Sequence, residues 1–78
     1  MLVLKLVNET ATEAAYNYYP EGKEMFGILI VNKDDGDIEV NKVAENDEFR
    51  RYLGHAVPKV KEFYDTTIYE KEVLVAWY

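Results

Sequence analysis

Two short turns, each containing a glycine, interrupt the stretch "YNYYPEGKEMFGILIVNKDDGDIEV", residues 16–40. In "YPEGK", residues 19–23, proline has the fixed φ that suits a turn, and Gly22 occupies the position that needs a left-handed conformation. "KDDGD", residues 33–37, repeats the pattern with Gly36. The two turns predict a three-stranded antiparallel meander over roughly 12–19, 23–32 and 37–43.

The same turns predict a register. If Tyr19 pairs with Lys23, then Tyr16 faces Phe26, and alternation of side chains divides the meander into two faces. The face that we expect to pack on a core holds Ala14, Tyr16, Tyr18, Phe26, Ile28, Ile30, Ile38 and Val40. The second face is mixed and holds Ala15, Asn17, Tyr19, Met25, Gly27, Leu29, Val31, Glu39 and Asn41.

Residues 46–64, "NDEFRRYLGHAVPKVKEFY", predict one helix. Asn46 is a favourable N-cap, and apolar side chains recur behind it at helical spacing. This stripe consists of Phe49, Tyr52, Leu53, Ala56, Val60 and Phe63. Pro58 lies inside the pattern and predicts either a bend that wraps the helix over a twisted sheet or a break into two short helices.

Both ends of the chain also resemble strands. The opening "LVLKLV" predicts one more strand, and "KEVLVAWY", residues 71–78, is apolar on both alternating sets. Such two-sided apolarity is typical of an interior strand or of a strand with a second partner. We therefore expect one α+β domain over residues 1–78, with an antiparallel sheet of four to five strands and one bent helix packed on one face. The strand order cannot be derived.

Composition excludes several classes of protein. The chain has 78 residues, of which 49% are hydrophobic and 31% charged, which predicts an ordered domain rather than a disordered segment. Its net charge of -6 argues against a nucleic-acid partner, and the lack of cysteine excludes disulfides and thiolate metal sites. "MLVLKLV" is too short to cross a membrane and lacks the features of a signal peptide. We expect a cytoplasmic protein without a membrane partner.

Catalytic and metal-binding patterns are missing from the sequence. His55 is the only histidine, it falls away from the apolar stripe, and the chain has neither serine nor cysteine to pair with it. The acidic turn over residues 32–39 does not fit a calcium loop, because Gly36 at the sixth position places Val31 first and Lys42 twelfth. We expect a non-enzymatic protein with no catalytic, cofactor-binding or metal-binding residue.

The tyrosines and the second face suggest a function in protein binding. Tyr16, Tyr18 and Tyr52 fall on core-facing positions, which predicts a packing role for them. The second face carries exposed apolar side chains, and contiguous patches of this kind are uncommon on small monomers. Our leading hypothesis is a small interaction module that forms a homodimer, or binds another protein, through Tyr19, Met25, Leu29 and Val31.

An acidic segment supports a second hypothesis. Residues 34–48 contain seven acidic residues and one basic residue, Lys42. A surface formed by Asp34, Asp35, Asp37 and Glu39 could steer a cationic partner, as in a regulator or inhibitor of a basic protein. The alternative is a solvated edge on which charge prevents aggregation.

Overall fold

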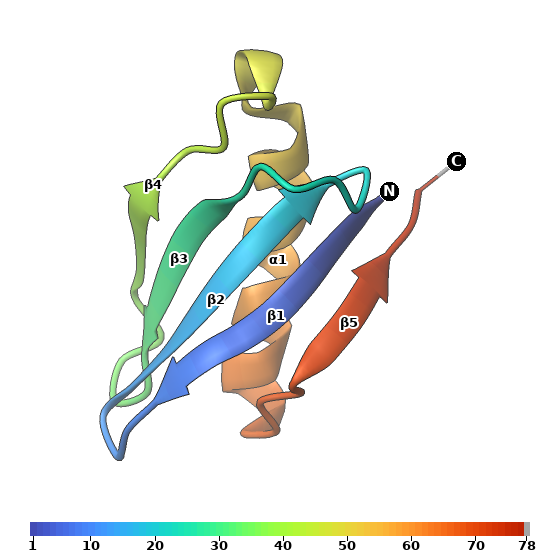
Figure 1. Ribbon diagram of the computed structural model, residues 1–78. Coiled ribbons are helices and arrows are strands. Elements are labelled where there is room, and N and C mark those ends of the chain that lie inside the picture. Colours follow the sequence, from blue (N-terminus) through green and yellow to red (C-terminus); the bar gives the residue numbers. More distant parts are fainter. Residues whose placement is uncertain (78) are drawn as a thin grey trace.

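The computed structural model describes residues 1–77, which form one sheet and one long helix (Figure 1). The strands are β1 (Leu2–Glu9), β2 (Glu13–Pro20), β3 (Gly27–Asn32), β4 (Ile38–Lys42) and β5 (Glu72–Val75). A single 3₁₀ turn, η1 (Glu48–Arg50), leads into helix α1 (Arg51–Thr66). The predicted α+β class, with an antiparallel sheet and one helix on one face, is confirmed.

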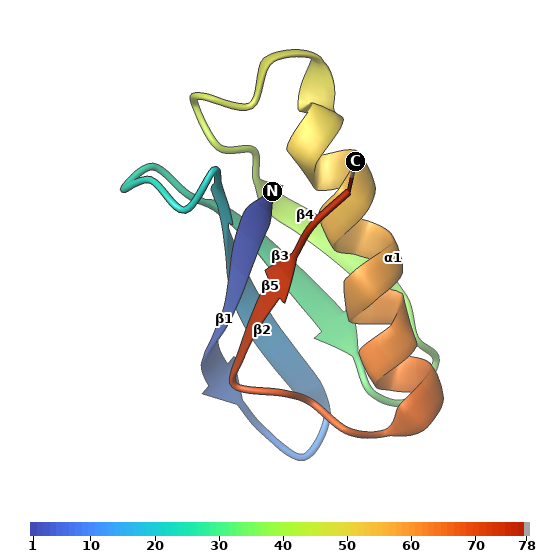
Figure 2. The same cartoon turned by 90° about the vertical axis from the view of Figure 1, so that its right-hand side faces the viewer.

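The strands follow the order β4-β3-β2-β1-β5, and every neighbouring pair is antiparallel. The first four strands form a meander, as their order along the chain predicts. Helix α1 then carries the chain across one face of the sheet to the opposite edge, where β5 pairs with β1 (Figures 1 and 2). The molecule thus has two layers, and α1 covers one face of the sheet (Figure 2).

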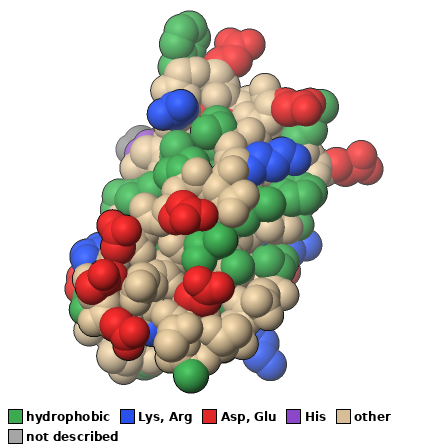
Figure 3. Space-filling model, turned by 90° about the vertical axis from the view of Figure 1, so that its left-hand side faces the viewer, with side chains coloured by type: hydrophobic (Ala, Val, Ile, Leu, Met, Phe, Trp, Pro, Cys, Tyr) green, Lys and Arg blue, Asp and Glu red, His purple; other side chains and the backbone are tan. Residues whose placement is uncertain are grey.

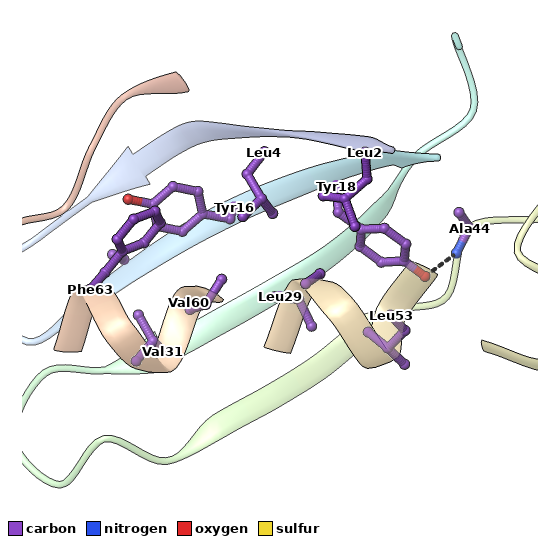
Figure 4. Packing of buried hydrophobic residues seen from close by; sticks show 12 residues of the cluster. Leu2, Leu4, Tyr16, Tyr18, Leu29, Val31, Ala44, Leu53, Val60 and Phe63 are labelled. Carbon is purple, nitrogen blue, oxygen red and sulfur yellow. Dashed lines mark hydrogen bonds between the residues drawn. The ribbon is translucent and has the colours of Figure 1, made fainter. Parts of the chain in front are cut away.

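The core lies between the sheet and α1 (Figure 4). The sheet buries Leu2, Leu4, Ala14, Tyr16, Tyr18, Leu29 and Val31 there. The helix contributes Leu53, Ala56, Val60 and Phe63, which confirms most of the predicted stripe. The ring of Phe63 packs against that of Tyr16 with 5.2 Å between centroids. Pro58 lies within one continuous helix, so the alternative of two short helices is wrong.

The helix begins five residues later than predicted, because Asp47 rather than Asn46 satisfies its first N–H groups. The carboxylate of Asp47 accepts hydrogen bonds from the backbone N–H of Tyr52 and Leu53, each at 2.9 Å. It also accepts one from the Tyr18 hydroxyl at 3.0 Å, which anchors this end of α1 to the sheet. Phe49, predicted on the apolar stripe, is instead 93% exposed in η1.

The predicted register between β2 and β3 is wrong. Tyr16 faces Leu29 rather than Phe26, because residues 21–26 separate the two strands where the turn predicted only three loop residues. Gly27 lies directly opposite Tyr18, and a Cβ at Gly27 would meet the Tyr18 ring and come within 2.6 Å of the Lys42 carbonyl oxygen. Only glycine leaves room for this ring, so Gly27 must lie opposite Tyr18. This requirement sets the register between β2 and β3.

The register change exchanges the two faces of β3, since a shift by an odd number of residues inverts every side chain. Leu29 and Val31 point into the core, while Ile28 and Ile30 point to the outer face. The second turn differs from its prediction by one residue, so that Val31 faces Ile38 and Ile30 faces Glu39. Both turn glycines have the expected left-handed backbone, with φ of 68° at Gly22 and 78° at Gly36.

Candidate functional site

No helix of residues 1–77 covers the face of the sheet opposite α1 (Figure 2). We call it the open face. The registers of the five strands place these residues on it: Val3, Lys5, Glu13, Ala15, Asn17, Tyr19, Ile28, Ile30, Glu39, Lys42, Glu72 and Leu74. The Phe26 ring joins them, with its centroid 5.5 Å from that of Tyr19.

Apolar side chains form a continuous patch on the open face. Leu74, Val3 and Tyr19 lie side by side on β5, β1 and β2, and Phe26 extends this row. Ile28 and Ile30 continue the patch toward β4. Most of these side chains are half-buried against one another, and Leu74 is 62% exposed. The open face thus combines an apolar centre with access for a partner.

Charged side chains border the apolar patch and nearly balance one another. The open face carries two lysines, Lys5 and Lys42, and three glutamates, Glu13, Glu39 and Glu72. Lys5 Nζ lies 3.8 Å from Glu72 Oε1 and 5.2 Å from the Tyr19 centroid, and Lys42 Nζ lies 4.7 Å from that of Phe26. Both lysines therefore stand over aromatic rings, where a cation is attracted by the π face.

The open face is hollowed over β1 and its neighbours β2 and β5, beside the loop that follows β2. The hollow has a volume of about 450 Å³ and is lined by Val3, Lys5, Tyr19, Gly22, Lys23, Glu24 and Glu72. This lining combines the apolar side chain of Val3 and the ring of Tyr19 with charged side chains of both signs. A protruding apolar side chain with a polar neighbour could enter such a recess.

The structure brings together only part of the interface predicted from the sequence. Tyr19 lies on the open face as expected, and Met25 is 50% exposed in the loop before β3. Leu29 and Val31 are fully buried in the core, so their prediction as exposed interface residues is wrong. Their neighbours Ile28 and Ile30 take their place. The signal that could have identified these two isoleucines was Gly27, the one β3 residue able to lie beneath Tyr18.

The predicted acidic surface is divided between two regions. Asp34, Asp35 and Asp37 are exposed in the β3–β4 turn. Acidic side chains gather on the lower part of the face that Figure 3 shows. Asp35 has a structural role, because its Oδ1 accepts a hydrogen bond from the Asp37 backbone N–H at 2.8 Å. Glu39 instead lies on the open face, opposite Ile30.

The two buried tyrosines of β2 have hydroxyl groups that stabilise the fold. The Tyr16 hydroxyl donates to the Glu70 carbonyl oxygen at 2.7 Å, and burial raises the pKa of Tyr16 well above its usual value. Burial, together with the Asp47 carboxylate, raises the pKa of Tyr18 to about 12. Both hydroxyls therefore stay protonated at neutral pH and are occupied by hydrogen bonds within the fold.

His55 falls away from the apolar stripe, which predicts an exposed side chain, but it is half-buried. Its ring stacks on that of Trp77 at a centroid distance of 3.7 Å and an angle of 9°, and Tyr52 packs edge-on against the same indole. Trp77 thus lies against the N-terminal half of α1. Within residues 1–77, no three His, Asp or Glu side chains converge as a metal site.

Comparisons with known proteins found no match to the chain among protein-family models, curated proteins or solved structures. Neither the length nor the apolar character that a membrane crossing requires occurs in any helix of residues 1–77.

Proposed function

We propose that the chain is a non-enzymatic interaction module that associates with a second copy of itself through the open face. The observation that carries this proposal is the apolar patch formed by Val3, Tyr19, Phe26, Ile28 and Ile30 on a sheet that α1 covers from one side only. A sheet with one uncovered apolar face gains stability when a second layer removes that face from water. A copy of the same sheet provides such a layer.

The charge of the open face favours a second copy over a basic partner. The whole chain has a net charge of -6. The open face carries two lysines and three glutamates, so it holds little of this net negative charge. Two identical chains repel each other least where their contact is nearly neutral. Around a two-fold axis, Lys5 or Lys42 of one chain can lie opposite a glutamate of the other.

The size of the open face is close to that of a specific contact. Neighbouring strands lie about 4.8 Å apart, so that five strands span about 20 Å, and eight residues of β1 or β2 extend about 26 Å. A face of roughly 500 Å² in projection approaches the ~800 Å² of accessible surface that each partner buries in a standard interface. Two such sheets would pack about 10 Å apart, as in a β-sandwich.

The proposed setting is the cytoplasm. A chain without cysteine makes no use of an oxidising compartment, which supports this placement.

Substitution of Ile30 by lysine tests the contact. Ile30 lies opposite Glu39 on the neighbouring strand, so a lysine there gains a favourable cross-strand pair and the fold should persist. Light scattering with size exclusion, over a hundredfold range of concentration, should give a smaller molecular mass for Ile30→Lys than for the unsubstituted chain.

Ile68→Lys is the matched control, because Ile68 is 64% exposed in the loop after α1, away from the sheet. We expect it to leave the mass unchanged. The proposal is wrong if the unsubstituted chain is monomeric up to about 1 mM, a concentration at which even a weak contact is populated. It is also wrong if Ile30→Lys and Ile68→Lys behave alike.

A second candidate function is regulation or inhibition of a basic protein. The exposure of Asp34, Asp35 and Asp37 together in one turn favours it. Binding that depends on this turn should weaken steeply with salt, and Asp34→Asn with Asp37→Asn should weaken it further. Retention of a basic partner in half-molar salt would contradict this second proposal.

A further inference from the structure

We propose that β5 pairs antiparallel with β5 of a second copy, so that two five-stranded sheets join into one continuous sheet. This contact uses the outer edge of β5 and not the open face. It therefore does not depend on the function proposed above.

The side chains of β5 are typical of an interior strand, although the strand lies at an edge. Val73 and Val75 pack against the core from the side of α1, while Leu74 points to the open face and is 62% exposed. No strand of residues 1–77 pairs with the outer side of β5. Figure 2 shows β5 in front of the sheet with its outer edge uncovered. Strands of this composition usually have a neighbour on each side, whereas β5 has one on a single side.

The backbone of β5 presents free hydrogen-bonding groups at this edge. In the antiparallel ladder with β1, the N–H of Leu6 donates to the carbonyl oxygen of Lys71 at 2.8 Å. Because hydrogen-bonded positions alternate along such a ladder, Val73 and Val75 direct their N–H and C=O groups toward β1. The N–H and C=O groups of Leu74 therefore point away from the sheet, as do those of Glu72.

The opposite edge of the sheet has features that discourage pairing. A bulge in the β3–β4 register interrupts β4, and its sequence "IEVNK" places charged or amide side chains at Glu39, Asn41 and Lys42. Bulges and charges are the usual means by which edge strands avoid other chains. β5, with the sequence "EVLV", has an unbroken register with β1 and only one charged residue, Glu72. The contrast identifies β5 as the edge that accepts a strand.

The sequence around Leu74 is nearly symmetric, which favours β5 of a second copy as the occupant. Residues 73–75 read Val-Leu-Val, so an antiparallel pair centred on Leu74 places Val73 opposite the partner's Val75. In this register Glu72 lies opposite the partner's Ala76, and no like charges face each other. The central pair joins Leu74 to the partner's Leu74 through the outward N–H and C=O groups of both.

Amide hydrogen exchange tests this contact directly. The N–H of Leu74 should exchange at least roughly tenfold more slowly at ~1 mM than at ~10 μM protein, since pairing removes it from water. The N–H of Val75, which faces β1, is the internal control and should be protected at both concentrations. Unprotected exchange of the Leu74 N–H at ~1 mM would overturn the proposal.

One lysine and one proline substitution separate this contact from the one through the open face, because the Leu74 side chain lies on that face and must stay apolar. Leu74→Pro removes the outward N–H that the central pair requires, while the bonds of Val73 and Val75 to β1 remain, so it should abolish edge pairing. Ile30→Lys, which disrupts the open face, should leave the protection of the Leu74 N–H intact. If both contacts form, the assembly has four chains, each single variant has two, and the double variant has one.

These measurements distinguish the failure of edge pairing from the failure of the open-face contact. Protection of the Leu74 N–H that disappears in Ile30→Lys would assign the contact to the open face and overturn edge pairing. A mass that falls with Leu74→Pro but not with Ile30→Lys would support edge pairing and contradict the function proposed above. Ile68→Lys again serves as the control for an added charge.

Discussion

Gly27 and Tyr18 form one tightly packed unit within the sheet. The Tyr18 ring lies where a side chain at position 27 would be. Its hydroxyl accepts a hydrogen bond from the Ala44 N–H at 3.0 Å (Figure 4) and donates one to the Asp47 carboxylate. One tyrosine therefore connects β2, β3, the chain after β4 and the start of α1. Its neighbours have little freedom to move, because the interior is closely packed.

Alanine at Gly27 should be strongly destabilising. A Cβ there overlaps the Tyr18 ring and lies 2.6 Å from the Lys42 carbonyl oxygen, so strands must separate to accept it. We expect a loss of about 3 kcal/mol or more in the free energy of unfolding, measured by urea denaturation. Gly54→Ala is the matched control, because no described atom outside its chain neighbours and the backbone of α1 lies within 4 Å of its Cβ position. In the helix this change should stabilise by up to ~1 kcal/mol, and equal effects of the two changes would contradict this prediction.

The hydroxyl of Tyr18 should make stability fall at alkaline pH. The folded state raises the pKa of Tyr18 from 10.0 to about 12, so the stabilising contribution is complete below pH 10. It is lost as the pH rises from 10 toward 12, because the unfolded chain then releases a proton that the folded chain retains. Urea denaturation between pH 8 and 12 should show this decline.

The variant Tyr18→Phe isolates the effect of this hydroxyl. At pH 8 it should be about 1–3 kcal/mol less stable, since the buried Asp47 carboxylate and the Ala44 N–H each lose a partner. Its stability should fall less between pH 10 and 12 than that of the unsubstituted chain. Parallel pH profiles for the two proteins would show that Tyr18 does not cause the decline.

At the scale of the elements, the start of α1 depends on a contact made before the helix begins. Phe49 and Arg50 adopt left-handed backbone conformations, with φ of 59° and 55°, that interrupt the helical path. This interruption lets Asp47 turn inward, where it is only 5% exposed. Its carboxylate then satisfies the first N–H groups of α1 and lies at the positive end of the helix dipole.

Removal of this cap should destabilise the protein. Asp47→Ala removes the acceptor for Tyr52, Leu53 and the Tyr18 hydroxyl, and we expect a loss of about 2 kcal/mol in the free energy of unfolding. Asn46→Ala is the matched control, since the Asn46 Oδ1 atom has no hydrogen-bond partner among the described residues. It should change stability by less than about 0.5 kcal/mol. A larger loss of stability for Asn46→Ala than for Asp47→Ala would contradict this prediction and support Asn46 as the cap.

At the scale of the whole molecule, a chain of 78 residues has limited apolar area to bury. One layer of helix covers one face of five strands, and the other face, together with the β5 edge, keeps apolar groups in contact with water. Association through either surface would therefore add to a stability that is marginal for a domain of this size.

The melting temperature should accordingly rise with protein concentration. A contact formed only by folded chains stabilises them by mass action, and we expect about 3–6 °C for each tenfold increase. Scanning calorimetry at several concentrations would measure this shift. The double variant Ile30→Lys with Leu74→Pro should melt at one temperature throughout. A constant melting temperature for the unsubstituted chain would contradict both proposed contacts.

The sequence by itself determined the features that depend on neighbours along the chain. Gly22 and Gly36 lie in left-handed turns, and Leu53, Ala56, Val60 and Phe63 form the buried stripe of the helix. These features follow from backbone conformations and helical spacing, which act over a few residues. They were sufficient to predict the α+β class and the meander.

Tertiary structure alone decided which faces and edges of those elements meet. The register of β3 depends on the Tyr18 ring above Gly27, and the start of α1 depends on an Asp47 carboxylate that also binds Tyr18. The position of β5 at an edge depends on the path of α1 across the sheet. These are contacts between residues that are distant in the chain. The observed register of β3 differs from the predicted one by an odd number of residues, and for this reason Ile28 and Ile30, rather than Leu29 and Val31, lie on the open face.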